Sequence, residues 1–366
     1  MTLNIPYPPD YGGMIDCFHR IRMLSKKGVN IHLHAFEYGR EHSKELESIC
    51  KIVNYYRRDT SSKRHFSLLP YSVVSRSSDE LLRNLLKNDY PVLFDGIQTT
   101  ILLNNPALAG RTKVVRIHNI EPVYYRSLAR YERNFLRKMY YLIEGAKLSR
   151  YESILSGADY LATLSITDHE YYNRKFKNSV LIPTSHQFDN IVCKPGSGDF
   201  ILYHADLSVN ENEAVAGFLI SKVFSRLSVN CIIAGRKPSL RISTQISHHP
   251  NIKLISDPAN ETMEELIMNA HINVIPSMAS NGFKLKLLLS LYCGRHCIVN
   301  NATVNGSGLY CLCHIADYGE KMVSKINQLM GKPFTEEMIE ERRTILSKNY
   351  NNLLNANRLM NLLFPE

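Results

Sequence analysis

Short apolar runs that fit β-strands alternate with helix-compatible stretches along nearly the whole chain. Such alternation is typical of parallel sheets with both faces covered, because each crossover between parallel strands carries a helix over one face. The sequence therefore predicts an α/β fold. The expected strands are VNIHLHAF, YPVLFDG, KVVRIHN and ADYLATLS in the first half, and DFILYHADL, VNCIIAG, NIKLIS, HINVIPS and HCIVN in the second.

The length of 366 residues predicts two domains, at about 150 residues each. Residues 186–200 contain Pro-Gly-Ser-Gly and are the best linker candidate. We expect one doubly wound domain over 1–185, a second over 198–334, and C-terminal helices over 335–366, with Thr335 as the N-cap. Two such domains are expected to face a cleft, with ligands at the carboxyl ends of the strands.

Composition excludes several classes of protein. Hydrophobic residues make up 44% and charged residues 21%, which excludes a disordered chain. No apolar run approaches the roughly 18 residues of a membrane helix, and the start, MTLNIPYPPDYGG, lacks the features of a signal peptide. We therefore expect a cytoplasmic protein whose eight cysteines are buried, reduced thiols.

The net charge of +10 is concentrated in residues 1–185, which hold 27 Lys and Arg against 18 Asp and Glu. This excess favours an anionic partner: nucleic acid, a phosphorylated substrate or an acidic membrane surface. Because no nucleic-acid-binding motif accompanies it, we expect no nucleic acid partner.

The stretch after Pro122 has helical periodicity. One face would carry apolar residues and the opposite face arginines. We favour a helix with its apolar face in the core and a solvated basic back; the alternative is a surface for anionic lipid or a lipid diphosphate. The apolar set is Leu128, Tyr131, Phe135, Met139 and Leu142, and the basic set is Arg126, Arg130, Arg133 and Arg137.

Two segments of the first half are candidates for ligand binding. Gly12 and Gly13 precede an expected helix, where free N–H groups and a missing Cβ suit a phosphate or sugar. His118 lies at the carboxyl end of an expected strand. A tight turn and a structural histidine are the respective alternatives.

The second half has one strong candidate. After the strand that ends at Pro276, Gly282 opens a helix with Lys284 and Lys286 in its first turn. Lysines at a helix N-terminus oppose the helix dipole unless an anion binds there, so we predict an anion site. Alternatively, both lysines point to solvent.

We expect no metal site and no cofactor. The cysteines and histidines between Cys293 and His314 lack a zinc-binding spacing. Hydrolase-triad, zincin, P-loop and dinucleotide motifs are also missing from the sequence.

Together these segments resemble the retaining glycosyltransferases of family four, with the GT-B fold of two Rossmann-like domains, and among them bacterial enzymes of surface polysaccharide biosynthesis. The resemblance covers nearly the whole chain. Its most specific match is INVIPSMASNGFKLKLLLSLYCGRHCIVN, which is similar to the family's P-S-x-x-E-G-F-G-L-x-x-x-E-A-x-x-x-G run. It also rests on PYPPDYGG, HNIEPVYYRSLA, SGADYLATLS and CIIAGRKP.

The resemblance implies a metal-independent hexosyltransferase that moves a sugar from a nucleotide-sugar, bound as substrate, to a glycan or lipid-linked acceptor. It implies acceptor binding by the first domain and donor binding by the second, with the C-terminal helices of 335–366 crossing back toward the first domain. If the acceptor is lipid-linked, we expect peripheral contact with the inner face of the plasma membrane. His118 and Lys286 would be catalytic. The implied donor-binding set is Gly12, Gly13, Asn281, Gly282, Phe283, Lys284 and Lys286, and the arginines Arg126, Arg130, Arg133 and Arg137 would meet the acceptor or membrane.

The chain departs from the family pattern at several positions. The family's E-x7-E carboxylates fall at Asn281 and Leu289, and its arginine after the first strand of the second domain falls near Asp206. We expect Lys284 and Lys286 to replace the family's basic pair in neutralising the diphosphate. No strong argument selects Glu211 or Glu213 for the missing ribose contact.

Two other functions remain open. Nucleotide-sugar epimerases share this architecture, and the missing carboxylates fit a non-catalytic protein that binds a nucleotide or glycan.

Only MTLNI precedes Pro6, so we expect the first central strand to be about half the usual roughly 5–6 residues.

Overall fold

The computed structural model describes residues 1–365, and the chain divides into two compact units. The first unit comprises Met1–Ala129, Phe135–Gln187 and the chain from Tyr350 onward. The second comprises Arg130–Asn134 and Phe188–Asn349.

The strands of the first unit are all parallel to their neighbours, as the strand–helix alternation predicted. One group pairs β1 with β2, and the other has the order β3-β4-β5-β6. The bounds are β1 His32–Glu37, β2 Ile52–Arg57, β3 Val92–Asp95, β4 Lys113–Ile117, β5 Tyr160–Thr163 and β6 Ser179–Leu181.

The first two residues join these two groups of strands. The N–H of Thr2 donates to the carbonyl of His34 at 2.8 Å, and the N–H of Asp95 donates to the carbonyl of Met1 at 2.9 Å. The expected short first strand is thus only a bridge at Thr2, which places the start of the chain between β1 and β3. The order in which the strands follow one another reverses at this point, so it is the topological switch point of the first unit.

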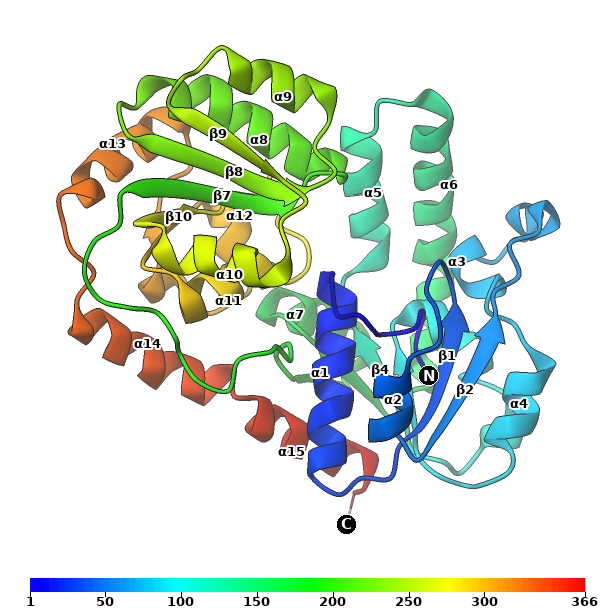
Figure 1. Ribbon diagram of the computed structural model, residues 1–366. Coiled ribbons are helices and arrows are strands. Elements are labelled where there is room, and N and C mark those ends of the chain that lie inside the picture. The colour runs from blue at the N-terminus through cyan, green and yellow to red at the C-terminus, as the bar shows by residue number, and fades with distance from the viewer. Residues whose placement is uncertain (366) are drawn as a thin grey trace. The chain divides into compact units, whose positions relative to one another are not determined.

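Helices cover both faces of the first unit's strands (Figure 1). Apolar residues of α4, α6 and α7 pack on one face, and those of α1, α2 and α15 pack on the other. The bounds are α1 Gly12–Lys26, α2 Lys44–Ile49, α3 Tyr71–Val74, α4 Asp79–Leu85, α5 Glu121–Tyr131, α6 Phe135–Tyr151, α7 Ile166–Phe176 and α15 Asn352–Leu363.

The second unit has a six-stranded parallel sheet of order β12-β11-β10-β7-β8-β9. Its switch point lies between β7 and β10, the two central strands. The bounds are β7 Phe200–Asp206, β8 Asn230–Arg236, β9 Ile252–Ser256, β10 Ile272–Val274, β11 His296–Val299 and β12 His314–Ile315.

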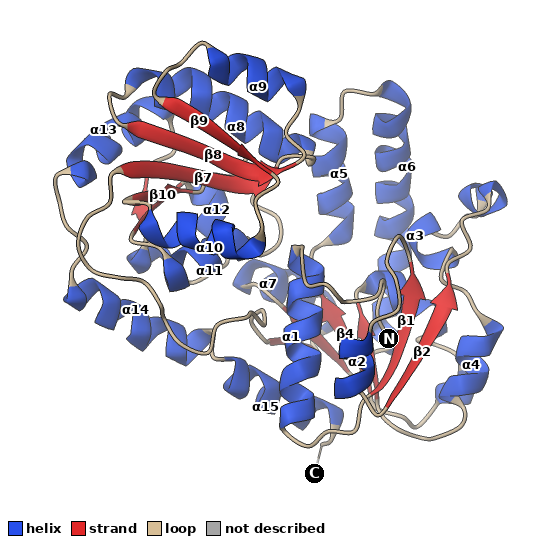
Figure 2. Cartoon of the chain, viewed as in Figure 1, coloured by secondary structure: helices blue, strands red, loops and turns tan. Residues whose placement is uncertain are grey.

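Helices α8, α9 and α13 bury their apolar residues against one face of this sheet, and α10 and α11 cover the other (Figure 2). The sheet core is continuous from Ile201 on β7 to Ile298 on β11. The bounds are α8 Asn210–Lys222, α9 Leu240–Ser247, α10 Asn260–Asn269, α11 Leu285–Cys293, α12 Asn301–Val304, α13 Gly319–Met330 and α14 Glu336–Asn349.

The sequence did not predict three of the strands, β2, β6 and β12. Strand β2 is half-exposed and lacks a continuous apolar run, while β6 and β12 are only three and two residues long. The C-terminal stretch was expected to be helical, and it forms two helices, α14 and α15, interrupted at Tyr350. Thr335 caps α14 through its hydroxyl, which accepts from the Met338 N–H at 3.4 Å.

The predicted continuous amphipathic helix after Pro122 is wrong. The chain leaves the helix at Glu132–Asn134, so the predicted apolar and basic faces are divided between α5 and α6. Phe135 is 71% exposed and Met139 39% exposed, so these apolar side chains do not face the core. Helix α6 is instead buried through Glu144, Gly145 and Leu148.

The cysteine prediction is confirmed for six of the eight thiols, which are free and buried. It is wrong for Cys311, which is exposed, and Cys313 is partly exposed. No helix within residues 1–365 combines the length and the apolar character needed to cross a bilayer.

Candidate functional site

At the first unit's switch point, five charged or titratable side chains form what we call the His118 cluster: Asp16, Arg20, Asp95, Arg116 and His118. They come from three elements that meet at the carboxyl edge of the sheet. Helix α1 supplies the first two, β3 ends at Asp95, and β4 supplies Arg116 just before His118.

Asp16 is the central acceptor of the His118 cluster. Its Oδ1 accepts from Arg116 Nη2 at 2.9 Å and from the Ser185 N–H at 2.7 Å, and its Oδ2 accepts from Arg116 Nε at 3.1 Å. Arg20 bonds to both Asp16 and Asp95. These contacts tie α1 to β3, to β4 and to the loop that follows β6.

Electrostatics keep both carboxylates of the cluster ionised. Burial alone would raise the pKa of Asp16, but Arg116 and Arg20 outweigh it and hold that pKa well below its usual range. The pKa of Asp95 is lowered in the same way, because Arg20 and His118 outweigh the effect of burial, which would raise it. Two buried carboxylates therefore face two buried guanidinium groups, and their formal charges cancel.

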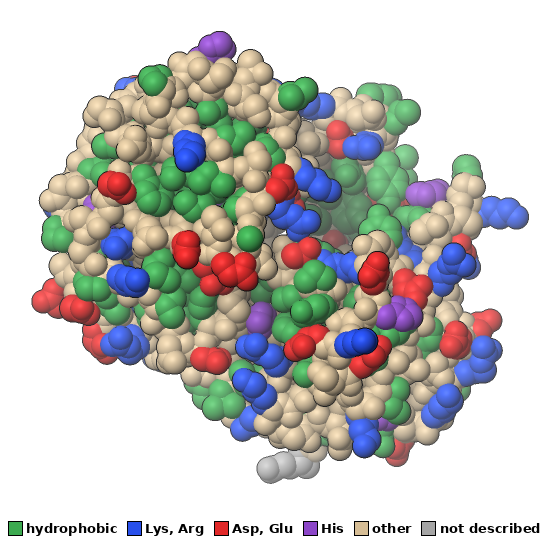
Figure 3. Space-filling model, in the orientation of Figure 1, with side chains coloured by type: hydrophobic (Ala, Val, Ile, Leu, Met, Phe, Trp, Pro, Cys, Tyr) green, Lys and Arg blue, Asp and Glu red, His purple; other side chains and the backbone are tan. Residues whose placement is uncertain are grey.

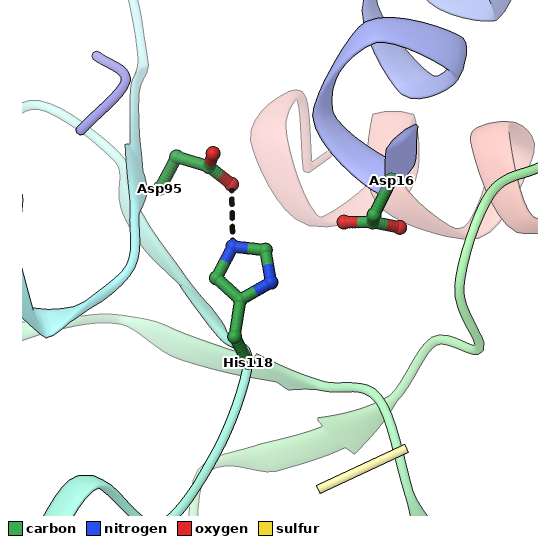
Figure 4. A group of neighbouring side chains, drawn as sticks. All are labelled: Asp16, Asp95 and His118. Carbon is green, nitrogen blue, oxygen red and sulfur yellow. Dashed lines mark hydrogen bonds and ion pairs between the residues drawn. The ribbon is translucent and has the colours of Figure 1, made fainter. Parts of the chain in front are cut away.

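His118 lies at the open side of the cluster, with its side chain 11% exposed. Its Nε2 is 3.1 Å from Asp95 Oδ1, and because this carboxylate can only accept, Nε2 carries the proton. The other ring nitrogen points away from Asp95 (Figure 4). Asp95 thus orients the ring and leaves one nitrogen for a ligand.

Ligand atoms of Asp16, Asp95 and His118 lie within 4.8 Å of one another, close enough to share one metal ion. Both carboxylates already accept from arginines, and a divalent cation there would lie next to two buried guanidinium groups. The donor set therefore does not fit a metal ion.

Gly12 and Gly13 form the first turn of α1, whereas we had expected them to precede the helix. Neither has a positive φ, so no left-handed backbone requires glycine at these positions. Helix α1 begins with no side-chain cap and no acidic residue in its first turn, so neither a cap nor a first-turn acid compensates the positive end of its dipole. Asp16 lies one turn further along, so this helix start adjoins the His118 cluster.

A polar hollow of about 640 Å³ lies beside the same helix start. Arg40 holds its two walls together by donating to the carbonyl of Pro8 at 2.5 Å and by pairing with Asp10. The lining residues are Tyr7, Pro8, Asp10, Gly39, Arg40, Glu41, His42, Ser43, Lys44 and Glu45.

In the second unit, the segment from Ser277 to Lys286, which we call the 277–286 loop, leaves the carboxyl end of β10 at the switch point. Gly282 has φ +63°, a left-handed conformation that disfavours any residue with a Cβ. Helix α11 begins at Leu285, so Lys284 is its N-cap residue, and only Lys286 lies in the first turn. The prediction of two lysines in that turn is therefore wrong.

Lys286 points inward, contrary to the alternative that both lysines reach solvent. Its ammonium lies 3.4 Å from Asn212 Oδ1 and 5.3 Å from the centre of the Tyr203 ring. Burial and the neighbouring Lys284 lower the pKa of Lys286 to about 8. Lys284 instead donates to the carbonyl of Asn281 at 3.0 Å.

Glu211 organises the 277–286 loop. Its Oε1 accepts from the Ser277 hydroxyl at 2.7 Å, from the Met278 N–H at 3.2 Å and from the Ala279 N–H at 3.1 Å. Glu213 accepts from the Ser239 hydroxyl at 2.7 Å instead. The loop is also held by Asn300, whose amide donates to the Ser277 carbonyl at 2.7 Å.

The structure brings the predicted site residues together within each unit. Gly12 and Gly13 adjoin the cluster that holds His118, and Asn281, Gly282, Phe283 and Lys284 lie in one loop with Lys286. The arginines do not form one face: Arg126 is on α5, Arg137 on α6, and Arg130 and Arg133 group with the second unit.

Sequence reasoning missed Asp16, Arg20, Asp95 and Arg116. One signal was present: Arg116 is a charged residue inside the buried run KVVRI, and such a residue needs a buried partner. The role of Glu211 had no comparable signal, since acids at a helix start are common.

Comparisons with known proteins support the fold. No family model matches this chain. A curated Klebsiella pneumoniae protein, described as an uncharacterized 44.6 kDa protein in the cps region, is 25% identical over 369 residues, 94% of this chain and 90% of its own length.

Three solved structures superpose on nearly the whole chain. Anabaena Alr3699/HepE in complex with UDP and glucose has a TM-score of 0.68 at 12% identity, covering 98% of this chain and 97% of that one. A glycosyltransferase from Rickettsia africae ESF-5 reaches 0.63 at 14% identity, covering 96% and 94%. The UDP-forming α,α-trehalose-phosphate synthase from Burkholderia xenovorans reaches 0.61 at 11% identity, covering 98% of each chain.

At such identities the likeness concerns the fold, and it agrees with the strand orders and the parallel sheets of both units. The chain has the GT-B fold, built from two Rossmann-like α/β units.

Proposed function

We propose that this protein is a glycosyltransferase that moves a sugar from a nucleotide-sugar donor to a glycan or lipid-linked acceptor, with retention at the anomeric carbon and without a metal ion. The observation that carries the proposal is the 277–286 loop. It places an inward-facing lysine, a left-handed glycine and a helix start at the switch point of the second unit's sheet.

This combination suits the diphosphate of a nucleotide-sugar. Backbone N–H groups at the start of α11 and the charge of Lys286 would neutralise the leaving phosphate as the glycosidic bond breaks. Lys284 and Lys286 stand in for the basic pair that the resembling family carries elsewhere. Anabaena HepE, which has the same fold, is described in complex with UDP and glucose, so UDP-sugars are the first donors to test.

We assign the donor nucleotide to the second unit and the acceptor to the first. In the first unit, His118 would contact the donor sugar through the ring nitrogen that Asp95 leaves unbound. The polar hollow beside Arg40 offers room for a sugar acceptor. A lipid-linked acceptor would bring the protein to the inner face of the membrane.

The reaction needs no protein nucleophile. The bond between the anomeric carbon and the diphosphate oxygen breaks, and the acceptor hydroxyl forms its bond on the same face. The acceptor proton passes to the departing phosphate oxygen. The protein positions both partners and stabilises the charge that develops on the leaving group.

We assign Glu211 to holding the 277–286 loop, which engages its Oε1, and not to the contacts of the missing family carboxylates. The absence of these carboxylates keeps a second function open, a non-catalytic protein that binds a nucleotide-sugar. A third function, that of a nucleotide-sugar epimerase with the same architecture, would differ from the proposed one because its product forms without an acceptor.

The testing experiment is thermal denaturation of the full chain with UDP, GDP, ADP, CMP and their sugars. A ligand at about 100 times its dissociation constant adds roughly 2.7 kcal/mol to the unfolding free energy. One nucleotide class should raise the melting temperature, and its sugar should be consumed when a glycan acceptor is supplied. A bound donor that is never consumed would favour the non-catalytic protein, and no shift with any ligand would overturn the proposal.

A further inference from the structure

Helix α6 of the first unit is amphipathic, but its apolar side faces outward. The helix packs on the unit through Glu144, Gly145 and Leu148. Its apolar residues at helical spacing on the opposite side are exposed: Phe135 71%, Leu136 77%, Met139 39%, Leu142 41% and Ile143 52%. We call this set the outward face of α6.

A second apolar element lies beside it. The loop of residues 62–69 exposes Phe66 at 89% and Leu68 at 93%, among the highest values for large apolar side chains in residues 1–365. The loop is attached to α6, since Lys147 Nζ donates to the carbonyl of His65 at 3.1 Å, and the His65 ring contacts Tyr140 edge-on. Figure 3 shows apolar side chains over α6 and at the tip of this loop.

The two segments that carry these apolar side chains are also basic. The loop 62–69 and α6 together contain six lysines and arginines, and their one acid is Glu144. Glu144 is buried and pairs with Lys147 at 3.1 Å. The six are Lys63, Arg64, Arg137, Lys138, Lys147 and Arg150. Arg64 forms a salt bridge with Asp59, which lies outside the two segments.

From this arrangement we infer that the outward face of α6 and the loop 62–69 dock the protein on an anionic lipid surface. The apolar tips enter the boundary of the acyl chains, and the cations of the same two segments meet the head groups. Charge selects this occupant over a second copy of the chain, because two such faces would bring like charges together. The inference deepens the proposed function by naming the surface through which a lipid-linked acceptor is reached.

This docking surface is not the arginine face that the sequence predicted. Of those four arginines, only Arg137 lies on α6. The apolar residues, not an arginine stripe, set the position of the docking surface, and the basic residues of the same two segments supply its preference for anionic lipid.

The chain contains no tryptophan, so one introduced indole reports its own surroundings. Phe66→Trp and Leu136→Trp place the reporter on the docking surface, and Leu240→Trp, at a residue 88% exposed in the second unit, is the matched control. With phosphatidylcholine–phosphatidylglycerol vesicles, the first two should shift their emission to the blue and be quenched by brominated lipid. The control should do neither.

Binding strength is measured by co-sedimentation with the same vesicles. Leu68→Ser combined with Leu136→Ser should weaken partitioning by about tenfold or more, because two large apolar side chains are lost from the buried contact. Leu240→Ser should leave it unchanged. Lys63→Gln with Lys138→Gln should reduce binding to anionic vesicles and its sensitivity to salt.

Equal binding of the wild type to vesicles of phosphatidylcholine alone, or a reporter shift that depends on protein concentration without vesicles, would overturn the inference. The latter result would indicate self-association. None of these measurements requires a nucleotide-sugar, so a protein that docks on vesicles but binds no donor contradicts the proposed function and not the docking surface.

Discussion

Arg116 Nη2 donates to Asp16 Oδ1 at 2.9 Å, although the two residues are 100 positions apart in the sequence. The pair joins the end of β4 to the start of α1, and both side chains are fully buried. Because Arg116 also donates to the carbonyls of Ile182 and Pro183, one guanidinium fixes three segments at the edge where His118 emerges.

Replacing Arg116 by methionine should destabilise the protein strongly. The substitution leaves the Asp16 carboxylate buried with fewer partners, and breaking a buried ion pair costs about 3–5 kcal/mol. Urea unfolding measures the loss. The matched control is Arg343→Met, because Arg343 pairs with Glu340 on the surface of α14 and contributes far less. Equal losses in both variants would contradict the role of Arg116.

His118→Ala should lower the turnover of the donor identified by thermal denaturation by roughly a hundredfold, if the ring contacts the sugar as charge develops. Asp95→Asn should lower it less and act on kcat more than on KM, because the ring remains but loses the carboxylate that orients it. His248→Ala is the control, since that side chain is exposed on the second unit. An unaffected His118→Ala variant would remove His118 from the reaction.

Donor affinity should depend on pH through Lys286. Its pKa of about 8 means that the ammonium loses its proton as the pH rises through that value, so affinity for the diphosphate should fall between about pH 7 and about pH 9. Calorimetry of nucleotide binding measures the profile. The Lys286→Arg variant should bind the nucleotide with an affinity that stays high across this pH range. The Lys286→Met variant should bind with an affinity that is low at every pH in the range. A wild-type profile that stays flat would show that Lys286 does not meet the phosphate.

Glu211→Ala should disorganise the 277–286 loop without unfolding the second unit. Three donors lose their acceptor, but they lie at a partly exposed edge where water can replace it. Nucleotide affinity should fall about tenfold while the midpoint of urea unfolding changes little. Glu213→Ala, which removes a hydrogen bond to Ser239 and an ion pair with Arg133 but no contact with the 277–286 loop, should leave nucleotide affinity near the wild-type value.

The sequence by itself predicted two parallel α/β units and most of their strands, because a buried parallel strand must be a continuous apolar run. Strand β2 was missed for the same reason, since its exposed position removes that run. The sequence also placed His118 at a strand end and Gly282 before a helix, where local rules on backbone geometry apply.

Tertiary structure alone decided the partners of these residues. Periodicity shows which residues share a face of a helix, but not whether that face is packed or exposed, so α6 was expected to bury the side chains that it exposes. The meeting of Asp16 with Arg116, and of Glu211 with Ser277, depends on strand order at two switch points. No local pattern encodes that order, because it arises when distant strands pair and bring their carboxyl ends to one edge.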